Sequence, residues 1–325
     1  MVIKMNLEDI EINRDPVIIF MGTPIFAVPV LKALIKKVKI NAIVTQPDRK
    51  KNKDGKVIIS PVKQVGIDNT ILVLQPENIK KQYEEVLSLN PDLIITCAYG
   101  QILPKEIIDY PRLGVVNIHA SLLPKLRGSA PIHHAIIDGY TKTGITLMYS
   151  TVKMDDGDII KQEEIDILST DTASSLHDKL SSLSAKMIIE SLDDILSGNT
   201  TRIVQNDLDA TYAPMIKRED EKIDFKKSKK AIFNQVRGLN SWPGSYCLYE
   251  GKILKVWECY CTNNNYSYKL DGEITNIYKD GFGVKVSNGE IVLTIVQPEG
   301  KKIMKATDFI NGEKNKKDVI GKVLE

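Results

Sequence analysis

Cysteine, histidine and long apolar runs are the features that this sequence has little of. Its four cysteines, Cys97, Cys247, Cys259 and Cys261, form no Cys-x-x-Cys pair and have no histidine at ligand spacing. We therefore expect neither a disulfide framework nor a zinc site. No stretch approaches the roughly 20 apolar residues that a membrane helix needs, and the start lacks the apolar core and cleavage site of a secretory signal. A cytoplasmic protein without membrane contact is expected.

Net charge is also nearly absent, at +2 for the whole chain. That total does not identify a nucleic-acid binder, because affinity for a phosphate backbone depends on where cations cluster. Residues 221–325 hold 18 Lys and Arg against 13 Asp and Glu, a balance of +5, which leaves −3 for the rest. The C-terminal third is therefore the basic part, although lysine-rich surfaces often serve solubility alone.

Length and pattern predict two domains, since 325 residues exceed one usual compact core. Up to about residue 200, short apolar runs alternate with amphipathic helical stretches, which is typical of parallel strands joined by crossover helices. We expect a Rossmann-like α/β domain over residues 1–200, closed by a helix over Thr170 to Leu196. The predicted strands are Val17 to Met21, Asn41 to Thr45, Ile71 to Leu74, Asp92 to Cys97, Val115 to His119 and Ile145 to Ser150.

The remainder of the chain has another pattern. Residues 201–220 are polar and lack a sustained period, so they are predicted as a linker. Beyond a helix near Lys229 to Leu239, strand-like runs alternate with turn signals such as Asp271-Gly272 and Asn288-Gly289. Residues 221–325 are therefore expected to form a small antiparallel, OB-like β-barrel, an architecture that often serves nucleic-acid binding.

The stretch from Leu113 to Pro131 carries the first candidate chemistry. If Val115 to His119 is a strand, Asn117 and His119 project to one face at its carboxyl end, where open α/β sheets bind ligands. An amide beside an imidazole suits acyl transfer, because Asn can hydrogen-bond a developing oxyanion while His donates to that oxygen or moves protons. A packed or surface histidine is the competing interpretation.

The loop after this strand favours the functional interpretation. Pro124, Gly128 and Pro131 require a defined backbone path, and Arg127 adds a cation beside the site. Long special loops after a strand are usually functional.

An acidic turn, Asp155-Asp156-Gly157-Asp158, follows the strand that ends near Ser150. One of its carboxylates could orient His119 and stabilise the protonated ring. A metal site and an ordinary polar turn are the alternatives, but the spacing lacks the ligand pattern of a calcium loop.

Combined, these motifs resemble the signature of enzymes that use 10-formyltetrahydrofolate. They are Asn117-x-His119, Ser121-Leu-Leu-Pro124-Lys-Leu-Arg127-Gly128-Ser-Ala-Pro131, Thr143-Gly-Ile-Thr and Asp155-Asp-Gly-Asp158. Further motifs resemble the methionyl-tRNA formyltransferase family specifically. They are Phe20-Met-Gly-Thr-Pro24, Val44-Thr-Gln-Pro-Asp48-Arg49, Ser60-Pro-Val-Lys63, Ala98-Tyr-Gly-Gln-Ile-Leu-Pro104, Ala210-Thr-Tyr-Ala-Pro214, Asn240-Ser-Trp-Pro-Gly244-Ser-Tyr246 and Gln297-Pro-Glu-Gly-Lys-Lys302.

The resemblance implies a formyl transfer from 10-formyltetrahydrofolate, without a metal, to the amino group of methionine on initiator tRNA. It implies that Asn117, His119 and Asp155 form the catalytic trio. It also implies that the folate site is lined by Ser121, Leu122, Leu123 and Pro124 together with Tyr99 and Gly100. We expect the enzyme to be a monomer.

A basic loop lies between Pro47 and Pro61. In the family, the corresponding insertion reaches into the end of the tRNA acceptor stem, which implies substrate binding by this loop. Arg127, the cation beside the active site, is also predicted to bind substrate. The loop's cations are Arg49, Lys50, Lys51, Lys53 and Lys56. The sequence departs from the family's usual Gly-Arg-Gly-Lys-Lys run, so the role is carried over but no base contact is.

Three rival functions share these residues. A formyltransferase for a small amine would need neither the basic barrel nor the basic loop, although a related sugar formyltransferase has a similar second domain. A hydrolase would release formate from the folate without any amine. A noncatalytic RNA-binding protein is disfavoured because Asn117 and His119 are both present.

Overall fold

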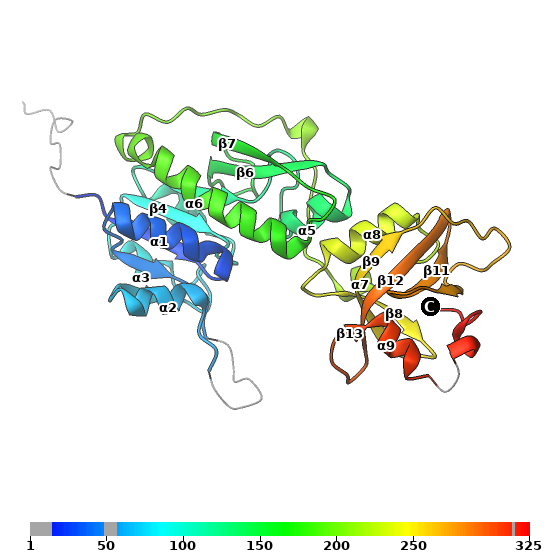
Figure 1. The fold of residues 1–325 in the computed structure, drawn as a ribbon. Helices are drawn as coiled ribbons and strands as arrows, with labels where there is room; N and C mark the ends of the chain where they lie inside the picture. The colour runs from blue at the N-terminus through cyan, green and yellow to red at the C-terminus, as the bar shows by residue number, and fades with distance from the viewer. Residues whose placement is uncertain (1–14, 49–56, 314–315) are drawn as a thin grey trace, which may run out of the picture. The chain divides into compact units, whose positions relative to one another are not determined.

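The computed structural model describes residues 15–48, 57–313 and 316–325. They form two compact units: one ends at Asn117 and also takes in Ile188–Thr200, and the other comprises Ile118–Met187 and Thr201–Glu325. Figure 1 traces the chain through its helices and strands. None of the described helices combines the length and the apolar character that crossing a bilayer would require.

The first unit is built on parallel strands, as the sequence predicts. Its strands are β1 (Ile18–Gly22), β2 (Ala42–Val44), β3 (Leu72–Leu74) and β4 (Leu93–Cys97), and β1 pairs in parallel with both β2 and β4. Every residue of β1 and β4 is buried, which explains their continuous apolar sequence. The helical segments between them are η2 (Ile25–Ala27), α1 (Val28–Lys37), α2 (Pro61–Asp68), α3 (Tyr83–Leu87) and α4 (Lys105–Asp109).

One seven-stranded sheet has the order β3-β2-β1-β4-β5-β6-β7. It includes β5 (Val115–His119), β6 (Lys142–Tyr149) and β7 (Ile159–Asp166), with α5 (Pro131–Ile137) between β5 and β6. The six predicted strands are confirmed, and β6 begins earlier than expected, at Lys142. The sequence did not predict β7, which pairs antiparallel with β6. Its exposed residues Gln162, Glu164 and Asp166 alternate with partly buried ones, as is common in a strand at the edge of a sheet.

The predicted closing helix is confirmed as α6 (Ala173–Ser197). Leu176, Leu180, Met187 and Leu192 are among its fully buried residues, at the three- and four-residue spacings that place them on one face. Gly198 follows the helix with a φ of +73°, a conformation that glycine adopts without steric cost and that commonly ends a helix.

The C-terminal part of the second unit is an antiparallel sheet, which confirms the predicted change of pattern. Its strands have the order β10-β11-β12-β9-β8, and β13 pairs with β12. The strands are β8 (Ser245–Tyr249), β9 (Lys252–Cys261), β10 (Ile274–Ile277), β11 (Phe282–Val286), β12 (Gly289–Pro298) and β13 (Met304–Lys305). The helical segments are η3 (Asp207–Asp209), α7 (Arg218–Glu221), α8 (Lys229–Gly238), α9 (Ala306–Asn311) and η4 (Lys316–Val319).

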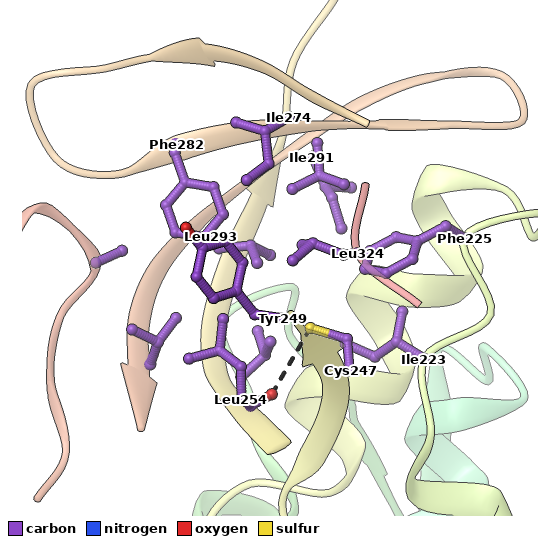
Figure 2. Close-up of a cluster of buried hydrophobic side chains, with 14 of the residues drawn as sticks. Ile223, Phe225, Cys247, Tyr249, Leu254, Ile274, Phe282, Ile291, Leu293 and Leu324 are labelled. Carbon is purple, nitrogen blue, oxygen red and sulfur yellow. Dashed lines mark hydrogen bonds between the residues drawn. The ribbon is translucent and has the colours of Figure 1, made fainter. Parts of the chain in front are cut away.

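A cluster of buried apolar side chains forms the hydrophobic core of this antiparallel sheet. Figure 2 shows Phe282 and Tyr249 beside Leu293, with Ile274 and Ile291 near them, and these side chains come from the four strands β8, β10, β11 and β12. The cluster therefore joins strands that are distant in sequence, and its burial is the main favourable contribution to their association.

Replacement of Phe282 tests this core. The side chain is fully buried, so Phe282→Ala should lower the free energy of unfolding by about 3–5 kcal/mol through lost burial and a residual cavity. Denaturant unfolding of the full chain measures the loss. Tyr268, which is 81% exposed, supplies the matched control: Tyr268→Ala should change stability by less than about 0.5 kcal/mol. Equal losses in the two variants would contradict the assigned core.

Candidate active site

Strand β5 carries the two polar residues at its carboxyl end. Asn117 and His119 lie two positions apart, so they project to the same face of the strand. Thr96, on β4, donates its hydroxyl hydrogen to Oδ1 of Asn117 at 2.7 Å. No partner is found among the described residues for the amide nitrogen of Asn117. The hydrogen bond from Thr96 therefore fixes the amide so that its N–H groups are available as donors.

The imidazole of His119 is buried and held on both sides. Its Nε2 lies 2.9 Å from the carbonyl oxygen of Leu126. A carbonyl oxygen can only accept, so this contact assigns the proton to Nε2. Nδ1 then faces Asp155, with Oδ1 at 3.7 Å, which is ion-pair range but longer than a hydrogen bond. A proton gained at Nδ1 would thus produce an imidazolium beside a carboxylate.

The carboxylate of Asp155 is placed by the loop that follows β5. The backbone N–H of Gly128 donates to its Oδ2 at 2.8 Å, while Oδ1 is the oxygen that faces His119. Asp155 has a φ of +52°, a left-handed conformation that is sparsely populated by residues other than glycine and is frequent at functional sites. The turn thus directs one specific carboxylate of its three toward the histidine.

Leu126 also has a left-handed backbone, with a φ of +60°. Such a conformation is unusual for a bulky residue, and it is stabilised by two hydrogen bonds that Thr211 accepts. The N–H of Leu126 donates to the Thr211 hydroxyl at 2.9 Å, and the N–H of Arg127 donates to the Thr211 carbonyl at 2.9 Å. Thr211 therefore supports the carbonyl that holds His119.

The segment Ser121 to Pro124 is locked by β6 and β7. The Thr146 hydroxyl donates to the carbonyl of Ser121 and accepts from the N–H of Leu123. Gln162 donates to the carbonyl of Leu123 at 2.8 Å. Ser121 and Leu123 are buried, whereas Leu122 and Pro124 are partly exposed, and the Leu123–Pro124 peptide bond is cis. The backbone is rigid, and Leu122 and Pro124 are the residues that it presents.

The Tyr99-Gly100 turn lies in the first unit. Thr23 donates its hydroxyl hydrogen to the Tyr99 carbonyl at 2.8 Å, and Gln46 donates to the same oxygen at 3.2 Å. Burial raises the pKa of the Tyr99 hydroxyl to about 12, and this hydroxyl has no hydrogen-bond partner among the described residues. Gly100 has a φ of +93°. A buried hydroxyl without a partner is the kind of group that a polar ligand would satisfy.

Arg127 lies within the protein, with 4% of its surface exposed. Its guanidinium donates to Oε1 of Gln205 through Nε at 3.1 Å and Nη2 at 2.8 Å, and to Asp207 at 2.8 Å. Gln205 and Asp207 belong to the segment predicted as a linker. The observed contacts of Arg127 are therefore with this segment, and a contact with substrate remains a prediction from the sequence.

The predicted basic loop, with Arg49, Lys50, Lys51, Lys53 and Lys56, lies outside the described residues. The residues on either side of the loop contact one another. Lys63 pairs with Asp48 at 2.6 Å, and this hydrogen bond holds the pKa of the Asp48 carboxyl below its usual value. Gln75 donates to the other oxygen of Asp48 at 2.8 Å. These contacts tie the residue before the loop to α2, which follows it.

Several supporting residues were not predicted as site residues. They are Thr96, Thr146, Gln162, Gln205 and Thr211. Thr146 and Thr211 lie within motifs that carry the family resemblance. The sequence therefore marked them as part of a motif, but it did not predict which groups they bond. A single Thr or Gln on a strand or in a polar segment has no pattern that distinguishes it from a surface residue.

Comparisons with known proteins identify the family of this chain. The family model described as formyl transferase matches residues 16–192, and the model described as formyl transferase, C-terminal domain, matches residues 215–314. Together they cover most of the chain and define its class as the formyl transferases. An N-formyltransferase from Helicobacter canadensis, solved with folinic acid and dTDP-3-aminofucose, has the same fold at a TM-score of 0.67 and 20% identity, over 86% of this chain and 99% of that one.

Curated relatives define the family within this class. Methionyl-tRNA formyltransferase from Bacillus licheniformis is 47% identical over 302 residues, which is 91% of this chain and 94% of that protein. The Bacillus subtilis protein of the same name is 44% identical over 306 residues, with the same coverage of both chains, 91% and 94%. The chain belongs to the methionyl-tRNA formyltransferase family.

Removal of the Thr96 hydroxyl tests the orientation of Asn117. Thr96→Val keeps the shape of the side chain but frees the amide to rotate, so kcat for formyl transfer should fall about tenfold, less than the ~10²–10³-fold expected for loss of an oxyanion donor in Asn117→Ala. Steady-state kinetics on folded variants measure this.

Thr143→Val is the matched control, because the Thr143 hydroxyl is also buried and has no partner among the described residues. Its kcat should stay near the wild-type value. Unchanged kcat in Thr96→Val would show that Asn117 does not need this hydrogen bond.

Proposed function

We propose that this protein transfers the formyl group of 10-formyltetrahydrofolate to the α-amino group of methionine carried on initiator tRNA. The observation that carries the proposal is the position of the His119 ring, held between the Leu126 carbonyl and the Asp155 carboxylate. The name of the curated relatives, and their similarity over 91% of this chain, support the choice of substrate.

Asn117 acts in this proposal as the donor to the oxyanion. When the amine adds to the formyl carbon, the carbonyl oxygen gains negative charge. A preorganised amide donor stabilises that charge without having to reorient during the reaction. The hydrogen bond from Thr96 to Oδ1 leaves the amide hydrogens of Asn117 for this purpose.

His119 and Asp155 act on protons. Addition forms a bond between the amine nitrogen and the formyl carbon, and collapse of the intermediate breaks the bond from that carbon to the donor nitrogen. One proton leaves the amine and one arrives at the departing nitrogen, so the reaction consumes no proton overall. Nδ1 of His119 can accept a proton because Asp155 faces it. A free α-amino group has a pKa of roughly 8, so little free energy is needed to supply the neutral nucleophile near pH 7.

The folate would be held by the rigid segment Ser121 to Pro124 and by the Tyr99-Gly100 turn. The residues fit such a ligand: Leu122 and Pro124 offer partly exposed apolar surface, and the Tyr99 hydroxyl lacks a partner among the described residues. The folate supplies the activated formyl carbon.

The tRNA would bind the basic C-terminal domain and the loop around Lys50 and Lys51. Residues 221–325 carry a balance of +5, and cations on a loop suit phosphate and single-strand contacts. We further propose domain bounds of 1–200, 201–220 and 221–325, an OB-like barrel for the last part, a monomeric enzyme and action in the cytoplasm.

Replacement of His119 tests the proposed chemistry. His119→Ala should reduce kcat about 10²–10⁴-fold, because it removes the group that moves protons. Its Kd for methionyl-tRNA should change less than about twofold, as the histidine is not proposed to bind RNA. Turnover assays and filter binding provide the two numbers. His177→Ala, a change of another histidine on α6, should leave both near wild type; full activity in His119→Ala would refute the mechanism.

Neutralisation of the basic loop tests the tRNA assignment. Replacing Lys50, Lys51 and Lys53 by alanine should raise the KM for tRNA but not the KM for the folate, and should lower the slope of log affinity against log salt by about 2–3, since each lost phosphate contact removes almost one released counterion.

The charge-matched control for the loop replaces Lys32, Lys36 and Lys39 by alanine. That variant should keep the wild-type KM and salt slope. The loop has no role in RNA binding if the two triple variants behave alike.

A further inference from the structure

Gln205 connects the predicted linker to the acidic turn. Its Nε2 donates to the backbone carbonyl of Asp155 at 2.9 Å and to that of Gly157 at 2.8 Å. On the other side of the same amide, Oε1 accepts two hydrogen bonds from Arg127. Gln205 is 9% exposed, so these bonds are largely shielded from water.

The amide of Gln205 is fully used by these contacts. Its two N–H donors meet two carbonyl oxygens, and its carbonyl oxygen meets two guanidinium N–H groups. Rotation of the amide by 180° would face N–H groups against Arg127 and an oxygen against two carbonyl oxygens, so its orientation is determined by its neighbours. A buried polar network with every member satisfied holds a single geometry.

The turn that Gln205 holds has little freedom to adjust elsewhere. A Cβ on Gly157 would lie 1.8 Å from the carbonyl oxygen of Tyr149, so the backbone approaches β6 closely at this point. Two residues earlier, Asp155 has its left-handed φ of +52°. Gln205 donates its hydrogen bonds to backbone carbonyls of the turn, one on each side of Asp156. Its contacts therefore set the turn's path and, through it, the direction of the Asp155 side chain.

The segment that contains Gln205 is itself bonded on both sides. Ile203 exchanges two backbone hydrogen bonds with Ile159 of β7, at 2.8 and 2.9 Å. Further along, Thr211 bonds Leu126 and Arg127. Gln205 thus lies between two anchored points, and its side chain is presented from a fixed backbone.

We propose that Gln205 is a positioning residue for formyl transfer: by binding the carbonyls of Asp155 and Gly157, and being oriented by Arg127, it keeps the Asp155 carboxylate against His119. The inference rests on the proposed roles of Asp155 and His119. It assigns the segment between the two family matches, residues 193–214, a direct part in the geometry of the active site.

Gln205→Glu is the sharpest test, because it replaces only the NH2 group of the amide by an oxygen. A glutamate keeps an oxygen for Arg127 but places a second oxygen against the two carbonyls. Gln235 provides a matched control in α8: it is also buried, and its Nε2 donates to the carbonyls of Asp220 and Lys222 at 2.9 and 3.0 Å. Gln235→Glu therefore removes the same kind of bonds far along the chain from Asp155.

The kinetic result we expect is a kcat lowered on the order of 10- to 100-fold in Gln205→Glu, as for a small displacement of a catalytic group, with both KM values within about twofold of wild type. Gln235→Glu should keep its kcat, measured well below the unfolding temperature of each variant. In an Asp155→Ala background, Gln205→Glu should lower kcat less than about threefold further, because its effect acts through Asp155.

Imidazole NMR tests the same claim without activity. The chain has four histidines, so the ring signals of His119 can be assigned from His119→Ala. In Gln205→Glu these signals should move in the same direction as in Asp155→Ala, and in Gln235→Glu they should not move. If the wild type failed to formylate methionyl-tRNA, the proposed function would fall while this readout still decided the positioning claim.

The inference is overturned if Gln205→Glu keeps both kcat and the His119 ring signals, or if it loses kcat by the same factor with and without Asp155. Should Gln205→Glu fail to fold, Arg127→Lys takes its place, because lysine cannot make the paired contacts with Oε1 of Gln205. That variant should show the same direction of change in kcat and in the His119 signals, and wild-type behaviour would refute the proposal.

Discussion

The hydrogen bond from the backbone N–H of Gly128 to Asp155 is the constraint on which the site depends. It joins the loop after β5 to the turn after β6 at 2.8 Å, and it leaves the other carboxylate oxygen facing His119. Gly128 has a φ of +125°, and a Cβ there would lie 2.6 Å from the carbonyl oxygen of Ala213. Glycine is therefore required both for the backbone angle and for the close approach of the chain.

The polar segment after α6 supports this arrangement from outside. The N–H of Ala213 donates to the carbonyl of Arg127 at 2.8 Å, and Thr211 bonds the residues on either side of the Leu126 carbonyl. Thr211 thus maintains the Leu126 carbonyl that contacts Nε2 of His119. In our proposal, Gln205 maintains the Asp155 carboxylate that faces Nδ1. The residues that join the two sheets along the chain are consequently also residues on which the active-site geometry rests.

The sequence predicted the elements well where periodicity or apolar runs mark them, as in β1, β4 and α6. It missed β7, because an edge strand with the sequence Lys-Gln-Glu-Glu has no apolar run. Asn117, His119 and Asp155 were predicted from motifs, and the structure places Oδ1 of Asp155 3.7 Å from Nδ1 of His119. Contacts such as that of Thr23, whose hydroxyl donates to the Tyr99 carbonyl, could not be predicted. Such long-range hydrogen bonds depend on tertiary structure, which no local pattern encodes.

Formylation of methionyl initiator tRNA by the purified protein, with 10-formyltetrahydrofolate as donor, tests the central claim most directly. The reaction should be run beside methionyl elongator tRNA, a small amino sugar nucleotide and a mixture without any acceptor. We predict rapid formation of formylmethionine on the initiator tRNA, slow reaction on the elongator and no formate without an acceptor. Formylation of the sugar nucleotide alone, or release of formate alone, would contradict the assignment to tRNA.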